Sequence, residues 1–332
     1  MIGNNRNNRN GEFAERGRIA RRLLAAVIYI MLAAAAYWYF KTHREDFSRM
    51  LSLKPAHLVG LLALNFISRI FLGARMKYLI EPFGTGLSLA EGTGVSLMQG
   101  YGNTVAVKGG TVGIAYYLYR TKGLGIDRFL AVTGGGFVIT AATLSVFGLV
   151  GYGLISMGGR YAGPAIPLIF SIILAGGIGA LLFPKLHVKT GKTGRFLLRV
   201  MEGWNVIKSN RSNILKLVAV EFMVLVTFAA RYWVAFDAFG QPIGLIGGFL
   251  LAPPAYLTTM VSVTPVGVGI REPLLAYMSG ILGYAVTGGL GAAVLDSLAL
   301  MAVSLVGGPV AALALVGRYD KQNGSERRRK AG

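Results

Sequence analysis

Four basic residues, Arg69, Lys108, Arg231 and Arg271, lie within stretches of sequence that are otherwise apolar enough for a lipid bilayer. A charged side chain inside a membrane is costly, and such residues commonly mark the path of a substrate or an ion. The planar guanidinium group of arginine binds two phosphate oxygens at once, whereas the lysine ammonium acts as a point charge. These residue types therefore predict a site for an anion, and phosphate is the best-matched chemistry.

The stretch that must position Arg271 is 264–273, with the sequence TPVGVGIREP. Two prolines and two glycines prevent a continuous helix there. Interrupted backbone at membrane depth is tolerated where protein buries it or where it lines a wet cavity. We therefore expect two half-helices to meet at a polar centre that includes Pro265, Gly269, Arg271 and Glu272.

A second interruption is expected at residues 104–110, between half-helices at about 92–103 and 111–120. The N-terminus of the second half-helix of each pair would present unpaired N–H groups and the positive end of a helix dipole. Both features favour an anion. Asn103 and Lys108 at this interruption, with Arg69 and Arg231 from the preceding spans, complete the predicted binding set.

Each of these residues also has a structural interpretation. Arg271 and Glu272 could form an internal ion pair that holds the interruption together. Arg69 and Arg231 could extend to an interface with water. Asp296 could neutralise a buried arginine or relay a proton, and Glu272 and Glu91 are the other candidates for a coupling proton. Glu221 is expected to form an ion pair facing the other helices.

The composition indicates a helical membrane protein. The chain has 332 residues, of which 54% are hydrophobic and 14% are charged, against about 25% charged in soluble domains. The net charge of +20 comes from basic residues at the ends of apolar runs, a topogenic pattern, so nucleic acid is not expected as a partner. Cysteine is absent, which excludes disulfides and thiol catalysis, and the three histidines show no ligand spacing. We expect no metal, no cofactor and no enzyme activity.

Basic residues also set the expected topology. Six full spans are expected, in the list 23–40, 58–74, 129–157, 164–183, 217–236 and 289–316. With both termini in the cytoplasm, 25 of the 34 Lys and Arg residues are cytoplasmic and 5 are external, which follows the positive-inside rule. The four that remain are Arg69, Lys108, Arg231 and Arg271. The protein is therefore expected in the cytoplasmic (inner) membrane.

The domain plan is a single transmembrane unit over 23–316 between two basic cytoplasmic tails, 1–22 and 317–332. Within it, 58–157 and 214–316 form an inverted internal repeat, because 12 of 47 residues over 105–151 are identical to those 156 positions later. The basic cytoplasmic segment 185–216, with an amphipathic helix at about 193–209, joins the repeats. Paired interrupted segments of this kind point to a central binding site in transporters.

Residues 263–272, VTPVGVGIRE, resemble the Pro-x-(Gly)-x-Gly-x-Arg-Glu motif of the lysylphosphatidylglycerol synthase transmembrane-region family, also called the flippase-like domain. The stretch 103–120 is similar to the family's first re-entrant motif, although Thr111 and Ile114 stand where the family tends to have Glu and Arg. The resemblance covers roughly 20–318. It implies spanning helices with two re-entrant pairs, and movement of a lipid with a charged head group between leaflets.

Lysylphosphatidylglycerol synthases carry an aminoacyl-transferase domain after this region, and here the chain stops at Gly332, so no synthase activity is expected. The function expected from the sequence is binding or translocation of an anionic lipid, of the phospholipid or polyprenyl-phosphate type. Two alternatives stay open: a membrane-embedded enzyme acting on lipid phosphates, and a non-transporting partner of a cell-envelope synthase. A second copy of the chain is a further candidate partner.

Overall fold

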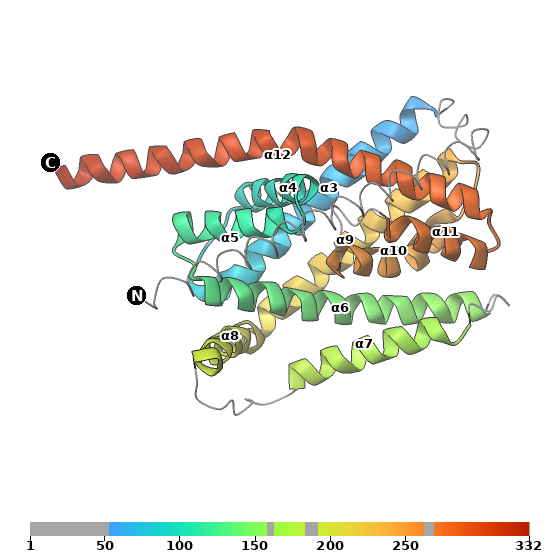
Figure 1. Ribbon diagram of the computed structural model, residues 1–332, viewed down its shortest axis with the longest axis horizontal. Helices are drawn as coiled ribbons and strands as arrows, with labels where there is room; N and C mark the ends of the chain where they lie inside the picture. Colours follow the sequence, from blue (N-terminus) through green and yellow to red (C-terminus); the bar gives the residue numbers. More distant parts are fainter. Residues whose placement is uncertain (1–52, 158–162, 183–191, 262–268, 332) are drawn as a thin grey trace, which may run out of the picture. The chain divides into compact units, whose positions relative to one another are not determined.

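The computed structural model describes residues 53–157, 163–182, 192–261 and 269–331, and none of these residues lies in a β-strand. In chain order the elements are α3 (Pro55–Ile80), the short 3-10 helix η2 (Glu81–Phe83), α4 (Leu89–Val105), α5 (Gly109–Lys122), α6 (Ile126–Met157), α7 (Ala165–Leu182), α8 (Lys192–Ser209), α9 (Arg211–Ala238), α10 (Gly244–Val261), α11 (Arg271–Ile281) and α12 (Val286–Ala331) (Figure 1). The expected all-α class is confirmed in this part of the chain.

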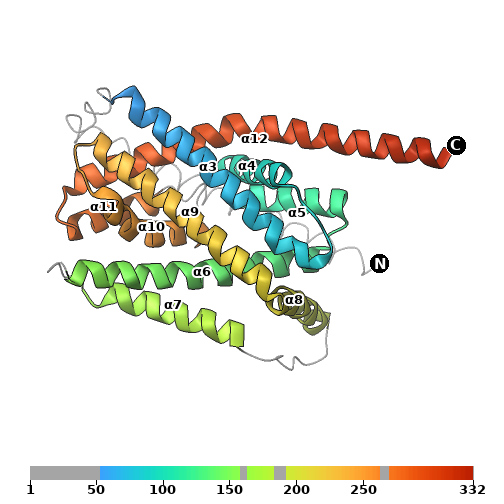
Figure 2. The same cartoon turned by 180° about the vertical axis from the view of Figure 1, so that it is seen from behind.

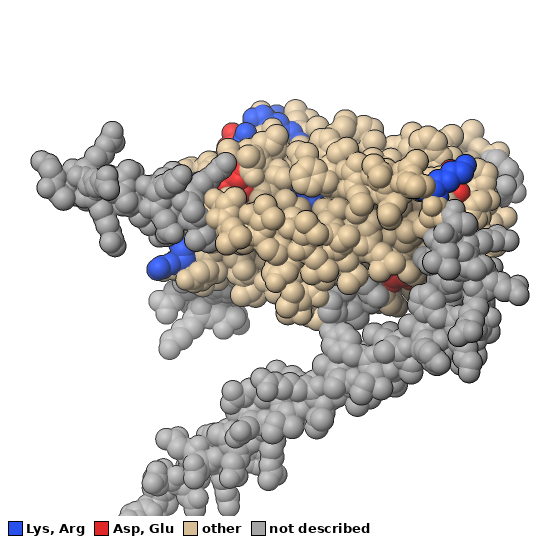
Figure 3. Space-filling view, turned by 90° about the horizontal axis from the view of Figure 1, so that it is seen from above, with Lys and Arg blue, Asp and Glu red and all other residues tan. Residues whose placement is uncertain are grey.

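Within the described ranges, four helical segments are long and apolar enough to cross a bilayer: Pro55–Phe83, Ile126–Leu154, Arg211–Ala238 and Val286–Leu315. They match four of the six expected spans, and α7 is a shorter apolar helix at the place of a fifth. The expected tail 1–22 and span 23–40 lie outside the described residues. On the face drawn in Figure 3, charged side chains gather toward the two ends and the middle is almost uncharged. This distribution fits a polytopic membrane protein.

Local sequence explains where the helices around the first interruption begin and end. Ser88 accepts a hydrogen bond from the Glu91 backbone N–H at the start of α4, which caps the N-terminus of the helix. Helix α4 stops at Val105 and α5 begins at Gly109, close to the expected break at 104–110. Helix α5 ends at Gly123, whose φ of 64° is a left-handed conformation that glycine adopts without strain.

Helices α4 and α5 approach each other closely because of Gly110. A Cβ atom added at Gly110 would lie 2.0 Å from the carbonyl oxygen of Gln99, so only glycine fits at this contact. The second interruption falls between the end of α10 at Val261 and the start of α11 at Arg271. Residues 262–268 within it, including Pro265, lie outside the described ranges.

Two of the long helices begin 156 residues apart. Helix α3 begins at Pro55 and helix α9 begins at Arg211. Helix α3 packs along α9, which Figures 1 and 2 both show. Helix α4 packs against α12, while α10 packs against α6. Helix α4, which follows α3 in the first expected repeat, therefore packs on α12, the last helix of the second. Helix α10, which follows α9 in the second expected repeat, packs on α6, the last helix of the first.

The segments between and after these helices are also helical. The amphipathic helix expected at 193–209 is α8, which buries Ile207 and places Trp204 against Gly135 of α6. The basic residues expected to form a tail at 317–332 instead continue α12 as far as Ala331. Helix α8 and the part of α12 beyond residue 316 contribute no residue to the site described below.

Candidate functional site: a cavity lined by basic side chains

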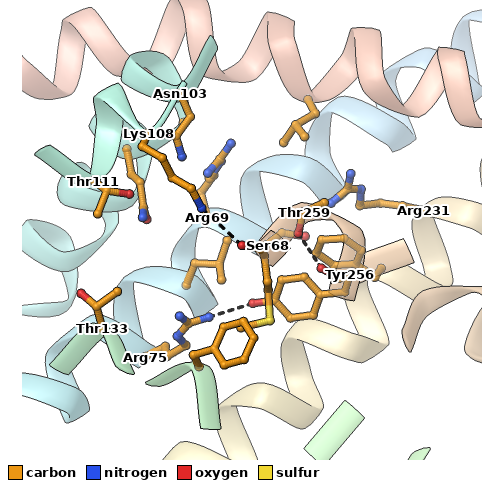
Figure 4. Close-up of a pocket in the computed structure, with 17 residues that line it drawn as sticks. Ser68, Arg69, Arg75, Asn103, Lys108, Thr111, Thr133, Arg231, Tyr256 and Thr259 are labelled. Atoms are coloured by element: carbon orange, nitrogen blue, oxygen red, sulfur yellow. Dashed lines mark hydrogen bonds between the residues drawn. The ribbon is translucent and has the colours of Figure 1, made fainter. Parts of the chain in front are cut away.

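A cavity of about 230 Å³ lies where α3, the α4–α5 interruption, α6, α9, α10 and α12 meet (Figure 4). Four of its lining residues are basic: Arg69 and Arg75 from α3, Lys108 from the interruption, and Arg231 from α9. Among the described residues that line it, none is Asp or Glu. Several helices thus direct positive charge into one space, which is the arrangement of an anion site.

Arg69 is held by neutral groups. Its Nη2 donates to the Ser304 hydroxyl of α12 at 2.8 Å, and its Nη1 donates to the Ser96 carbonyl of α4 at 3.3 Å. The residue is 8% exposed, and its buried Nε has no hydrogen-bond partner among the described residues. A Cβ atom at Gly100 would lie 2.4 Å from Nη2, so this glycine makes room for the guanidinium group.

Lys108 links the two interruptions. It precedes α5 with a φ of 59°, a left-handed conformation that is uncommon for a non-glycine residue. Its Nζ donates to the Met260 carbonyl at 3.4 Å, one residue before α10 ends. Beside it, the Asn103 Oδ1 accepts a hydrogen bond from the Gly110 N–H. One N–H group that was expected to face the anion is therefore already paired within the protein.

Arg75 lies on the other side of the cavity and is held by a carboxylate. Its Nε lies 3.4 Å from Glu221 Oε1 of α9, and its Nη1 donates to the Tyr256 hydroxyl of α10 at 2.8 Å. The same Glu221 oxygen accepts a short hydrogen bond from Thr140 of α6. Glu221 thus forms the ion pair expected from the sequence, with a partner that the sequence had not indicated.

Arg231 is shared between the cavity and a buried carboxylate. Its Nε and Nη2 donate to the two oxygens of Asp296 at 2.8 and 2.7 Å, a bidentate geometry that fixes the guanidinium plane. Its Nη1 is buried and has no hydrogen-bond partner among the described residues. Arg231 also lines the cavity, so its position there is fixed by Asp296.

Arg271 occupies a different place from the one expected. It is 0% exposed and is not among the residues that line the cavity. Its Nη1 lies 3.4 Å from Asp296 Oδ2, and its Nη2 donates a short hydrogen bond to Ser297. Glu272 accepts from the Gly269 N–H at 2.7 Å and from the Ser297 hydroxyl at 2.6 Å. This network joins the start of α11 to α12, the structural alternative drawn from the sequence.

Glu91, the third candidate for a coupling proton, lies away from the cavity. Its two carboxylate oxygens accept from the Tyr117 hydroxyl at 2.8 Å and from Lys122 at 3.0 Å. These contacts connect the start of α4 to the end of α5. Pro265, the remaining candidate, lies outside the described residues. In the described part of the chain, no group of three His, Cys, Asp or Glu residues could hold a metal ion.

The sequence interpretation missed Arg75, although a signal for it exists. Residues 156 positions apart occupy corresponding places around the two ion pairs: Arg75 and Arg231, Thr140 and Asp296, and Asn65 and Glu221. Arg75 pairs with Glu221, which Thr140 contacts, while Arg231 pairs with Asp296, beside which Asn65 lies. Applying the repeat spacing to Arg231 would have found Arg75.

Comparison with sequence models of protein families gives a match over most of the chain. The sequence model of the lysylphosphatidylglycerol synthase TM region matches residues 22–308. The chain belongs to this family. Comparison with curated proteins finds no match. The matched region therefore includes every residue that lines the cavity, and membership relates this membrane protein to lipid handling.

Proposed function

We propose that the protein binds an anionic lipid in the basic cavity and moves it between the leaflets of the membrane. The observation that carries this proposal is the convergence of Arg69, Arg75, Lys108 and Arg231 on one cavity that no described carboxylate lines. Two buried donors there, Arg69 Nε and Arg231 Nη1, have no hydrogen-bond partner among the described residues. Buried donors without partners are costly, and an anion in the cavity would offset the positive charge of these side chains.

The surroundings of Lys108 suit a ligand that has tails. Val105, Val107 and Val112 flank the interruption and are exposed, at 65%, 44% and 68%. The head group would occupy the basic cavity while its acyl or prenyl chains leave beside these apolar residues into the bilayer. A lipid is therefore a better match than a soluble anion of the same charge.

The exchange of packing partners at the 156-residue spacing supports an inverted repeat with two re-entrant pairs. In such transporters, one repeat rocks against the other and exposes a central site to each side in turn. We place the protein in the inner membrane with both termini in the cytoplasm. We also propose transport rather than enzyme activity, because Glu221, Asp296 and Glu272 are each engaged by an arginine.

Leaflet exchange in reconstituted liposomes tests the proposal. The wild-type protein is expected to accelerate exchange of labelled anionic lipids over protein-free liposomes. Arg69→Gln and Lys108→Gly each remove one cavity charge, and Lys108→Gly places a glycine at a φ it adopts freely. Each variant should slow exchange by about tenfold or more, because a hydrogen bond to a charged group contributes about 1.5–3 kcal/mol.

The matched control is Lys122→Gln, which removes a lysine from the other end of α5, where it pairs with Glu91. This variant should retain wild-type exchange. No acceleration by the wild-type protein for any anionic lipid would contradict the proposal. Equal rates for the wild type and both cavity variants would contradict it as well.

A further inference from the structure

The charges around the cavity do not balance. Three arginines have a carboxylate partner: Arg75 has Glu221 at 3.4 Å, Arg231 has Asp296 at 2.7 Å, and Arg271 has Glu272 at 3.9 Å and Asp296 at 3.4 Å. Arg69 and Lys108 have no carboxylate within 4.0 Å among the described residues. Five basic groups against three carboxylates leave two positive charges in excess.

Both excess charges face the cavity. Arg69 is nine-tenths buried and is held by a serine hydroxyl and a backbone carbonyl, while Lys108 is held by the Met260 carbonyl. Neutral partners hold both side chains in place; Arg69 is buried, whereas Lys108 is exposed at the mouth of the interruption, and neither has a carboxylate partner among the described residues. The charge missing from the site is therefore two negative charges, and the ligand is the species that can supply them.

The excess charge of the site matches that of a terminal phosphate. Arg69 Nε and Arg231 Nη1 are buried without partners, and Lys108 Nζ has only a long contact of 3.4 Å. These donors come from α3, α9 and the α4–α5 interruption. A phosphomonoester carries about two negative charges above its second pKa of about 6 and has three terminal oxygens. A phosphodiester carries one charge on two such oxygens and would leave one basic group uncompensated.

We propose that the cavity selects a phosphate dianion, the terminal phosphomonoester of a lipid, over a phosphodiester head group. The inference rests on the proposed function, because it assumes that the occupant of the cavity is a lipid. The chemistry is shared with inorganic phosphate, so the test separates these two sources.

Competitive binding to the purified full-length protein in nanodiscs tests the selection. Phosphatidic acid and phosphatidylmethanol with the same acyl chains differ in that the first is a monoester and the second a diester. At pH 8 the wild-type protein should bind phosphatidic acid about tenfold more tightly or better, since one further charged hydrogen bond is made. Arg69→Gln and Lys108→Gly should reduce this ratio toward one, and Lys122→Gln should not.

Lowering the pH to 5 provides a second measurement. The phosphomonoester gains a proton below its second pKa, so the preference for phosphatidic acid should largely disappear. The protein groups that face or adjoin the cavity are Arg69, Arg75, Lys108, Arg231, Tyr256, Glu221, Asp296, Arg271 and Glu272. If one of them titrated instead, affinity for the diester would change as well, and a constant diester affinity therefore assigns the effect to the ligand.

The outcomes separate this inference from the proposed function. Equal affinities for the two lipids at pH 8, with leaflet exchange intact, would overturn the selection and leave the function standing. Binding of neither lipid, together with no leaflet exchange, would overturn both. If inorganic phosphate displaced phosphatidic acid at a similar concentration, the dianion site would belong to soluble phosphate, and the lipid assignment would be overturned.

Discussion

At the scale of single residues, Asp296 contacts two buried arginines, Arg231 and Arg271. It binds Arg231 through both oxygens and lies 3.4 Å from Arg271, so one carboxylate orients a cavity arginine and anchors the start of α11. The types of these residues and their membrane depth could be predicted from the sequence. Their pairing could not, because Arg231 and Asp296 come from α9 and α12 and only packing brings them together.

Asp296→Asn should therefore destabilise the fold strongly. Removing one partner of a buried ion pair typically costs about 3–5 kcal/mol, since the other charge stays buried without compensation. The measurement is the free energy of unfolding in mixed micelles, compared with that of Glu91→Gln, whose pair with Lys122 lies away from the cavity. We expect Glu91→Gln to cost about 1 kcal/mol or less. If the free energy of unfolding fell equally in both variants, Asp296 would not stabilise the fold through its buried ion pairs.

At the scale of helices, the α4–α5 interruption and the end of α10 meet at the cavity. The α4–α5 interruption turns the chain so that Lys108 reaches the end of α10, and a continuous helix could not place it there. Polar residues and glycines predicted the first interruption close to its observed position, while most of the second, 262–268, lies outside the described residues. The displacement of Arg271 from the cavity could not be predicted, because it depends on Ser297 and Asp296 of α12, which lie far away in sequence.

Two glycines of α5 test the close approach of α4 and α5. Gly110→Ala would place a Cβ atom 2.0 Å from the Gln99 carbonyl oxygen, whereas a Cβ atom at Gly113 meets nothing within 4 Å. Gly110→Ala should lower the unfolding temperature and abolish lipid exchange, since backbone must move to relieve the clash. Gly113→Ala should be neutral or stabilising by up to about 1 kcal/mol, because alanine favours a helix. Equal unfolding temperatures for the two variants would contradict this packing.

At the scale of the whole molecule, part of the sequence recurs at a spacing of 156 residues, with 12 identities in 47 positions. Arg75 and Arg231, which each bind a buried carboxylate, lie at the same spacing. The orientation in the membrane follows from the positive-inside rule, and it makes a prediction that can be checked without removing any native cysteine, because the chain has none.

Single cysteines at opposite ends of the helices report that orientation. Ser156 near the end of α6 and Ser209 at the end of α8 are both exposed. In intact cells, a membrane-impermeant maleimide should label Ser156→Cys, and it should label Ser209→Cys only after the membrane is permeabilised. The cysteine-free wild type serves as the control. The reverse labelling pattern would place the termini outside and contradict the proposed topology.

The basic cavity is proposed to hold the head group of an anionic lipid. The most direct test is a density map of the full-length protein in nanodiscs that contain an anionic lipid. We expect phosphate density in contact with Arg69 and Lys108, with the tails continuing past Val105 and Val112 into the bilayer. A cavity without such density, in a map that resolves lipids around the outer surface of the helices, would contradict the claim.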